Sequence, residues 1–200
     1  MPVAPTILCF RHDLRLADNS ALAAAIAVGA PVIPVFIWSP EECANWAPGA
    51  ASRWWLHHAL KSLGQDLEIV GGRLLLREGE SLSVLREIVQ ATSAGRVFWN
   101  RRYAGALRAV DAEVKRALRA DGVEVQSYNS SLLNEPHTVA AGSGSPYKVY
   151  TPYWKKVKDR AIEAPVVVDL EQIQWPNDWP ESDTLEQLQL LPKVNWAGGM

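Results

Sequence analysis

The chain has 200 residues, of which 48% are hydrophobic and 21% charged, and its formal net charge is -2 at pH 7. This length suits one medium α/β domain and a tail, since a domain usually has about 100 to 200 residues. The charge balance argues against a nucleic-acid-binding surface on this chain, and no apolar run approaches the roughly 18 residues that would cross a bilayer.

The first predicted element is a strand over residues 7–10, an unbroken apolar run that is typical of a strand buried on both faces. A charged turn follows it, in which Arg11, Asp13 and Arg15 alternate with other residues. We interpret these three side chains as a local ion-pair cluster that fixes the turn, a structural role rather than a ligand site.

Asp18 and Asn19 end this turn and offer a side-chain oxygen to cap a helix that begins near Ser20. The turn contains no glycine, so its backbone cannot approach a pyrophosphate as a G-x-G-x-x-G turn does. A nicotinamide-dependent dehydrogenase is therefore disfavoured.

Strands and helices alternate through the next hundred residues. Further strands are predicted at residues 31–38, 73–79, 96–100 and 123–128. Pro34 lies inside the first of these and cannot donate a hydrogen bond, so pairing is expected to begin after it or to be locally irregular. The long loop 39–51 precedes a helix that should begin near Ser52, and loops of this length are often functional.

Two more helices are predicted from apolar stripes at helical spacing, over residues 81–92 and around 107–118. Gly95 is expected to close the first of them, and Gly122 occupies the C′ position of the second. On the second helix, Asp111 and Lys115 are spaced as an i, i+4 ion pair. The alternation predicts a doubly wound, Rossmann-like, five-stranded parallel sheet with helices on both faces.

The pattern changes after residue 130. A Gly- and Ser-rich stretch at 142–145, interpreted as a mobile surface turn, precedes a helix with Thr151 and Pro152 expected at its N-cap and N1 positions. Beyond residue 165 the chain is rich in Pro, Asp and Glu and reads as a linker with one short helical segment around 184–189. We therefore divide the chain into residues 1–130, 131–164 and 165–200.

Three stretches resemble the DNA photolyase and cryptochrome family of blue-light flavoproteins: FRHDLRLADNSAL (10–22), GSGSPYKVYTPYWK (142–155) and LLPKVNWAGG (190–199). The resemblance implies that residues 1–130 are the N-terminal α/β antenna domain, closed by 131–164, and that 165–200 lead to a helical FAD domain absent from this chain. It implies light-driven, FAD-dependent repair of pyrimidine dimers in DNA by the longer protein, in which this chain alone is not catalytic. Its partners would be its own helical domain and, through the full-length protein, damaged DNA.

Ligands of an open α/β sheet bind beyond the carboxyl ends of the strands. In the family this crevice holds an antenna chromophore, which is a folate, a deazaflavin or a flavin. The resemblance places deazaflavin-type contacts at Ile37, Trp38 and Arg53, aligns an acidic contact with Arg102, and aligns a folate-binding glutamate with Leu107. At Arg102 and Leu107 this sequence therefore lacks the carboxylate that the family has. Each loss removes a hydrogen-bond acceptor for the dye, so the dye could be a different molecule, weakly bound or absent. For Trp38, packing and dye contact are about equally supported, because aromatic residues dominate both cores and ligand pockets.

Two other functions remain open from the sequence. The domain could belong to a cryptochrome-like photoreceptor, or the chain could be a stand-alone nucleotide-binding module of the same fold. No catalytic residues are predicted, because the sequence contains no acid/base constellation. No metal-binding residues are predicted either, because His57 and His58 are adjacent and point in different directions.

The expected location is the cytoplasm. The first residues, MPVAPT, have no basic region followed by an apolar core, as a secretory signal would. The two cysteines, Cys9 and Cys43, give no disulfide framework, and we expect both to be inert.

Overall fold

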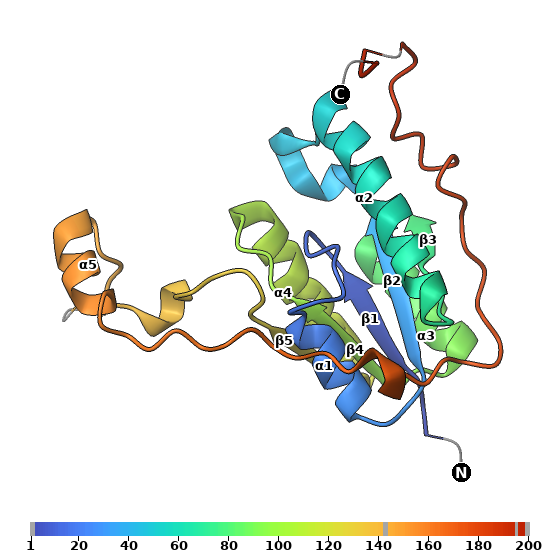
Figure 1. The fold of residues 1–200 in the computed structure, drawn as a ribbon, viewed down its shortest axis with the longest axis horizontal. Helices are drawn as coiled ribbons and strands as arrows, with labels where there is room; N and C mark the ends of the chain where they lie inside the picture. Colours follow the sequence, from blue (N-terminus) through green and yellow to red (C-terminus); the bar gives the residue numbers. More distant parts are fainter. Residues whose placement is uncertain (1–2, 142–143, 195, 199–200) are drawn as a thin grey trace.

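The structure is a computed structural model that describes residues 3–141, 144–194 and 196–198. Its centre is a sheet of five strands that all pair in parallel, in the order β3-β2-β1-β4-β5 (Figure 1). The strands are β1 (Thr6–Phe10), β2 (Val32–Trp38), β3 (Leu75–Glu78), β4 (Arg96–Asn100) and β5 (Glu124–Tyr128). The predicted doubly wound α/β fold is confirmed.

In the part of the chain that the structure describes, five α-helices and three 3₁₀ turns connect and follow these strands. The helices are α1 (Ser20–Ala27), α2 (Ala50–Ile69), α3 (Ser81–Thr92), α4 (Gly105–Ala120) and α5 (Tyr150–Val157). The 3₁₀ turns are η1 (Pro40–Trp46), η2 (Pro136–Thr138) and η3 (Leu170–Gln172).

Three predictions about helices are wrong in detail. Helix α3 is closed by Ser93, which takes the left-handed conformation at φ 53° two residues before Gly95. Helix α5 begins at Tyr150 with Val149 as its N-cap, ahead of the expected Thr151. Residues 185–189 form turns, not the short helix expected at 184–189. Gly122 has a φ of 85°, as its predicted C′ position requires.

The strand side chains divide into two apolar layers because neighbouring residues of a strand point to opposite faces. On one face, Leu8 and Phe10 of β1 pack with helices α1 and α2. On the other face, Ile7 and Cys9 pack with α3 and α4. Burial on both faces explains why β1 and β2 are unbroken apolar runs.

Pro34 is accommodated without a break in β2. The strand pairs with β1 from Val32 onward but with β3 only from Val35. The Val32 N–H bonds the carbonyl of Gln174, on the side of β2 away from β1. Since backbone groups alternate along a strand, the nitrogen of Pro34 faces that same side, where no ladder bond to β3 has yet begun.

Residues 165–194, which we call the strap, run past α1 and along α2 and β3 (Figure 1). The Trp175 indole donates to the carbonyl of Val70, and Leu188 and Leu190 are buried in the α1–α2 layer. Asp183 forms an antiparallel bridge with Leu76 of the β3 edge. The composition predicts a linker here, and the structure adds that this segment packs against the sheet.

The opposite edge of the sheet is protected by arginine side chains. On β5, the carbonyl of Val125 accepts from Arg119 (2.7 Å) and that of Ser127 accepts from Arg101 (2.6 Å). Backbone groups occupied in this way are not free to pair with another strand, which disfavours aggregation at the two edges. Within the described ranges, no helix combines the length and apolar character needed to cross a membrane.

Candidate functional site

A cavity of about 760 Å³ opens beyond the carboxyl ends of β1 and β2. Its volume lies in the range of about 300–1,000 Å³ that small-molecule sites occupy. Five aromatic side chains and three arginines contribute to its lining: Phe10, Phe36, Trp38, Trp54, Trp55, Arg11, Arg15 and Arg102. Among the described residues, no carboxylate lines it. The cavity therefore combines flat apolar walls with positive charge.

The loop that forms its floor is held by Asn100, at the end of β4. The Asn100 amide donates to Asp13 (2.6 Å) and to Asn19 (2.7 Å), and its oxygen accepts from the Ala21 N–H (3.1 Å). Asn19 caps α1 as predicted, accepting from the Leu22 N–H at 3.0 Å. Both asparagines are buried, so these bonds fix the turn after β1 in an environment without competing water.

Arg11, Asp13 and Arg15 do not form the predicted ion pairs with one another. The Asp13 carboxylate accepts from the Arg11 backbone N–H (2.9 Å), while the guanidinium of Arg11 reaches Asp111 on α4. Arg15 donates to the carbonyl of Ser130 (2.7 Å), after β5, and pairs with Asp18 (3.6 Å). The residues do fix the turn, but through backbone groups and through the distant partners Asp111 and Ser130 as well as through Asp18, not by pairing with one another.

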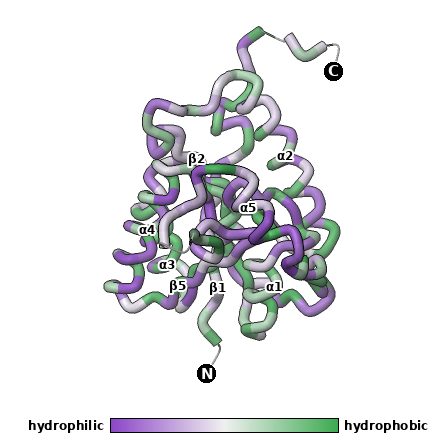
Figure 2. Tube along the Cα trace, turned by 90° about the vertical axis from the view of Figure 1, so that its left-hand side faces the viewer, coloured by the Kyte–Doolittle hydropathy of each residue, from purple (hydrophilic) through white to green (hydrophobic). Residues whose placement is uncertain are grey.

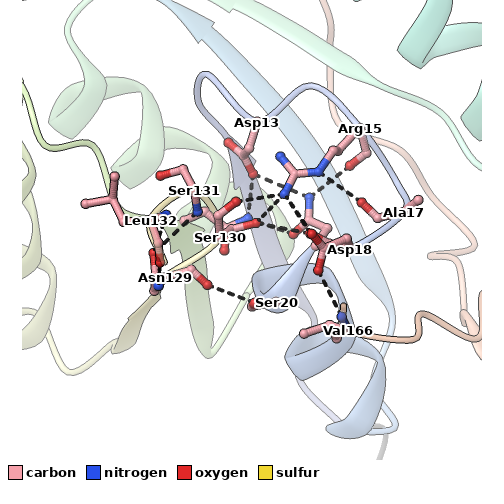
Figure 3. Close-up of polar contacts among 12 residues, drawn as sticks. Asp13, Arg15, Ala17, Asp18, Ser20, Asn129, Ser130, Ser131, Leu132 and Val166 are labelled. Atoms are coloured by element: carbon pink, nitrogen blue, oxygen red, sulfur yellow. Dashed lines mark hydrogen bonds and ion pairs between the residues drawn. The ribbon is translucent and has the colours of Figure 1, made fainter. Parts of the chain in front are cut away.

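Figure 3 shows how this turn ties three segments together. Besides the Arg15 contact, Ser20 donates to the carbonyl of Asn129 (2.9 Å), which anchors the residues after β5. The Asp18 carboxylate accepts from the Val166 N–H (2.9 Å), which anchors the start of the strap. The charged turn is thus the junction of the sheet, the segment after β5 and the strap.

Four charged side chains form a nearly buried cluster beside the cavity, which we call the four-charge cluster: Arg11, Glu42, Arg102 and Asp111. Arg102 holds Asp111 with two bonds, at 2.6 and 3.1 Å, and Arg11 approaches the same carboxylate at 3.3 Å. Ser81 closes the ring, since its hydroxyl donates to Glu42 and accepts from Arg11. Two positive and two negative charges compensate each other.

This cluster corrects the predicted pair between Asp111 and Lys115. Lys115 instead donates to the Ser127 hydroxyl (2.9 Å), and its pKa is lowered, mainly by burial and then by neighbouring arginines. Asp111 lies in the buried stripe of α4 between Leu107 and Val114. A carboxylate within an apolar stripe is the sequence signal for a buried ion pair, and the helical spacing to Lys115 obscured it.

Arg11 also has an unpaired donor, which is closed off from solvent. Its side chain is only 3% exposed, its guanidinium lies 5.5 Å from the centre of the Trp99 ring, and its Nε has no hydrogen-bond partner among the described residues. An unpaired buried N–H of this kind costs free energy.

The structure brings together three of the five residues that the family resemblance singled out. Ile37, Trp38 and Arg102 line the 760 Å³ cavity. Arg53 instead lines two neighbouring cavities between α2 and the strap, one of which Trp38 also borders. Leu107 is buried, 6% exposed, on α4 and does not contribute to the described lining of these cavities.

The histidines and cysteines of the described residues do not gather into a metal site. His57 is buried and His58 exposed, and no group of three metal-ligating side chains occurs in the described ranges. Cys9 and Cys43 are free, and burial raises the pKa of both thiols, which disfavours the reactive thiolate.

Tyr103, in the loop after β4, has a phenol whose pKa is raised to about 12, first by burial and then by its hydrogen bond to Glu135 (2.6 Å). Between pH 10 and 12 the unfolded state therefore loses this proton while the folded state keeps it. Because the unfolded chain then binds fewer protons than the folded chain, the free energy of unfolding falls as the pH rises from 10 to 12.

We expect Tyr103→Phe to lose less stability than the wild type between pH 10 and 12. Urea unfolding at several pH values measures this difference, and absorbance of ionised tyrosine provides a second readout. Tyr150→Phe, which changes an exposed tyrosine on α5, is the matched control. Parallel pH profiles of the wild type and Tyr103→Phe would contradict the prediction.

The sequence of this chain is similar to sequences of one known protein family. The DNA photolyase family model matches residues 6–171. The deoxyribodipyrimidine photo-lyase of Agrobacterium fabrum is 42% identical over 198 residues, which cover 98% of this chain and 41% of that protein. Cryptochrome-2 of Arabidopsis thaliana is 42% identical over 160 residues, covering 80% of this chain and 26% of the cryptochrome.

The fold agrees with these matches. The crystal structure of a bacterial class III photolyase from Agrobacterium tumefaciens superimposes with a TM-score of 0.89 at 42% identity, covering 98% of this chain and 40% of that one. The chain thus spans about two fifths of the length of its photolyase relatives. A family model that matches most of the chain, together with these relatives, shows that it belongs to the DNA photolyase/cryptochrome family, as the N-terminal photolyase domain.

Proposed function

We propose that this chain is the light-harvesting domain of a DNA photolyase. Its cavity would hold a planar antenna dye, and the longer protein would use the absorbed energy for FAD-dependent splitting of pyrimidine dimers. The observation that carries the proposal is the aromatic, carboxylate-free cavity at the carboxyl ends of β1 and β2. Light harvesting needs rigid placement of a dye rather than an acid, a base or a nucleophile.

The lining suits a flat heteroaromatic ring with an anionic tail, the chemistry that a folate, a deazaflavin and a flavin nucleotide share. Trp54 and Trp38 line the cavity with aromatic rings, and the guanidinium groups of Arg102 and Arg15 line it as hydrogen-bond donors whose charges are partly compensated by Asp111 and Asp18. When bound, the dye would supply near-ultraviolet and blue absorption, and this chain would fix its orientation and exclude water.

The photolyase relatives are more than twice as long as this chain, and we use that extra length to assign the remaining functions. We assign FAD, and the repair reaction itself, to a helical domain beyond the 200 residues, and we assign contact with damaged DNA in repair to the full-length protein. Residues 1–130 form the antenna domain in this proposal, 131–164 close it, and 165–200 lead toward the helical domain. The isolated chain should then leave dimer-containing DNA unrepaired under light.

The test is a titration of the purified chain with a reduced folate, a deazaflavin and FMN, followed by absorbance and tryptophan quenching. Trp54→Ala should weaken binding of the accepted dye about tenfold, since stacking on one aromatic side chain contributes about 1–3 kcal/mol. Trp46→Ala is the matched control, because Trp46 is 86% exposed and does not line the cavity. A chain that binds none of the three dyes, or equal losses in both variants, would refute the proposal.

Arg53→Gln tests the position that the family resemblance implies. If it weakens dye binding while Trp54→Ala does not, the dye lies in the cavities between α2 and the strap. The cryptochrome relatives support a second candidate, in which the same domain serves a photoreceptor. Illumination of the longer protein with dimer-containing DNA separates the two, because only a photolyase restores intact pyrimidines.

A further inference from the structure

We infer that residues 147–160, comprising α5 and its flanks, form a contact surface for the phosphate backbone and bases of a nucleic acid. We call these residues the basic-aromatic segment. The inference is independent of the antenna cavity, which none of these residues lines. It revises the expectation from the net charge, because a chain-wide balance of -2 conceals how the charges are distributed.

Positive charge is concentrated in this segment. Its 14 residues carry five cations and a single carboxylate, Asp159: the cations are Lys148, Lys155, Lys156, Lys158 and Arg160. All five cations are exposed. Lys158 pairs with Asp159 at 3.5 Å, whereas Lys148, Lys155 and Lys156 have no carboxylate partner among the described residues. Unpaired, clustered cations are the feature that binds phosphate and releases counterions.

Aromatic rings lie among these cations. Tyr150 is 69% exposed and Trp154 is 48% exposed, and their rings stack with centroids 6.2 Å apart at an interplanar angle of 11°. Their spacing of four residues puts them on one face of α5, and Lys158 continues that face one turn later. Exposed rings beside cations form the stacking platform on which single-stranded nucleic acids bind.

The position of α5 leaves this face open. In Figure 1 the helix stands apart from the sheet and its covering helices, at the end of a long excursion after β5. Only Val157 of the helix is buried, whereas a helix that packs on a core buries a whole apolar stripe. The tube around α5 is coloured largely as hydrophilic in Figure 2. Charge complementarity favours a polyanion over an apolar protein surface as the occupant.

The experiment measures binding of the 200-residue chain to a fluorescein-labelled thymidine single strand of about 16 nucleotides, by anisotropy at several NaCl concentrations. The test variant is Lys155→Gln/Lys156→Gln/Lys158→Gln. The control variant is Lys61→Gln/Arg73→Gln/Lys193→Gln, which removes the same charge from exposed positions elsewhere. The test variant should bind at least tenfold more weakly, and the slope of log K against log[NaCl] should fall by about 2, at about 0.7 per lost phosphate contact.

The aromatic part is tested separately. Trp154→Ala should weaken binding about fivefold or more without changing the salt slope, because stacking releases no counterions. Absence of binding by the wild type at low salt, or equal losses in the two triple variants, would overturn the inference. The latter result would indicate that binding depends on the total charge of the chain rather than on α5. Failure of dye binding would leave this assay unaffected, so the two proposals fail separately.

Discussion

Asp111→Ala is expected to lower the free energy of unfolding by about 3–5 kcal/mol, the usual cost of removing one partner from a buried ion pair. Asp111 is the carboxylate that both Arg11 and Arg102 contact, and all three side chains are at most 10% exposed. Its loss leaves two guanidinium groups in a low-dielectric site with Glu42 as the remaining counter-charge, 3.9 Å from Arg102. The desolvation penalty of the arginines is then largely uncompensated.

Equilibrium urea unfolding of the chain measures this effect. Asp121→Ala is the matched control: it removes a carboxylate that pairs with Arg86 at 2.7 Å, but both of those side chains are at least 41% exposed. We expect it to change stability by no more than about 1 kcal/mol, because exposed ion pairs contribute little. Similar losses in both variants would mean that the four-charge cluster is not an energetic unit.

Gly72→Ala is expected to destabilise the chain by about 1–3 kcal/mol, through steric overlap between the added methyl group and the strap. A Cβ at Gly72 would lie 2.5 Å from two carbon atoms of the Trp175 ring and 2.9 Å from a third. The ring cannot move freely, since its Nε1 donates to the carbonyl of Val70 at 2.9 Å. Either this hydrogen bond breaks or the strap moves away from β2 and α2.

The measurement combines urea unfolding with limited proteolysis, in which a displaced strap should be cut faster. Gly64→Ala is the matched control, because Gly64 lies inside α2 with open space around it, and alanine there should stabilise by up to about 1 kcal/mol. In the double variant with Trp175→Ala, the Gly72→Ala substitution should cost much less than it does alone. A persistent cost there would place the strain in the backbone rather than at the ring.

Much of the secondary structure could be predicted because its signals are local. The bounds of α3 and β4 agree with the prediction to the residue, since an apolar stripe and a short apolar run delimit them. The fold class followed from the alternation of these elements. The helix ends were less accurate, because Ser93 adopts a left-handed conformation that sequence assigns first to glycine.

The candidate site was only partly predictable. The carboxyl ends of the strands were the expected place, and Trp38 and Arg102 do line the cavity there. Glu42, Ser81 and Asn100 were missed as parts of its support. Each contacts residues about 40 to 90 positions away in the sequence, and no local pattern reports such a contact.

By itself, the sequence determined the order of strands and helices, the capping of α1 by Asn19 and the family, because these depend on neighbouring residues or on motifs read along the chain. The tertiary structure alone decided the partners of Arg11 and Asp111, the packing of Trp175 onto Gly72 and the isolation of the charges on α5. The physical reason is that charge compensation, packing and exposure depend on which surfaces meet after folding, and the same side chain can be buried or free depending on its place in space.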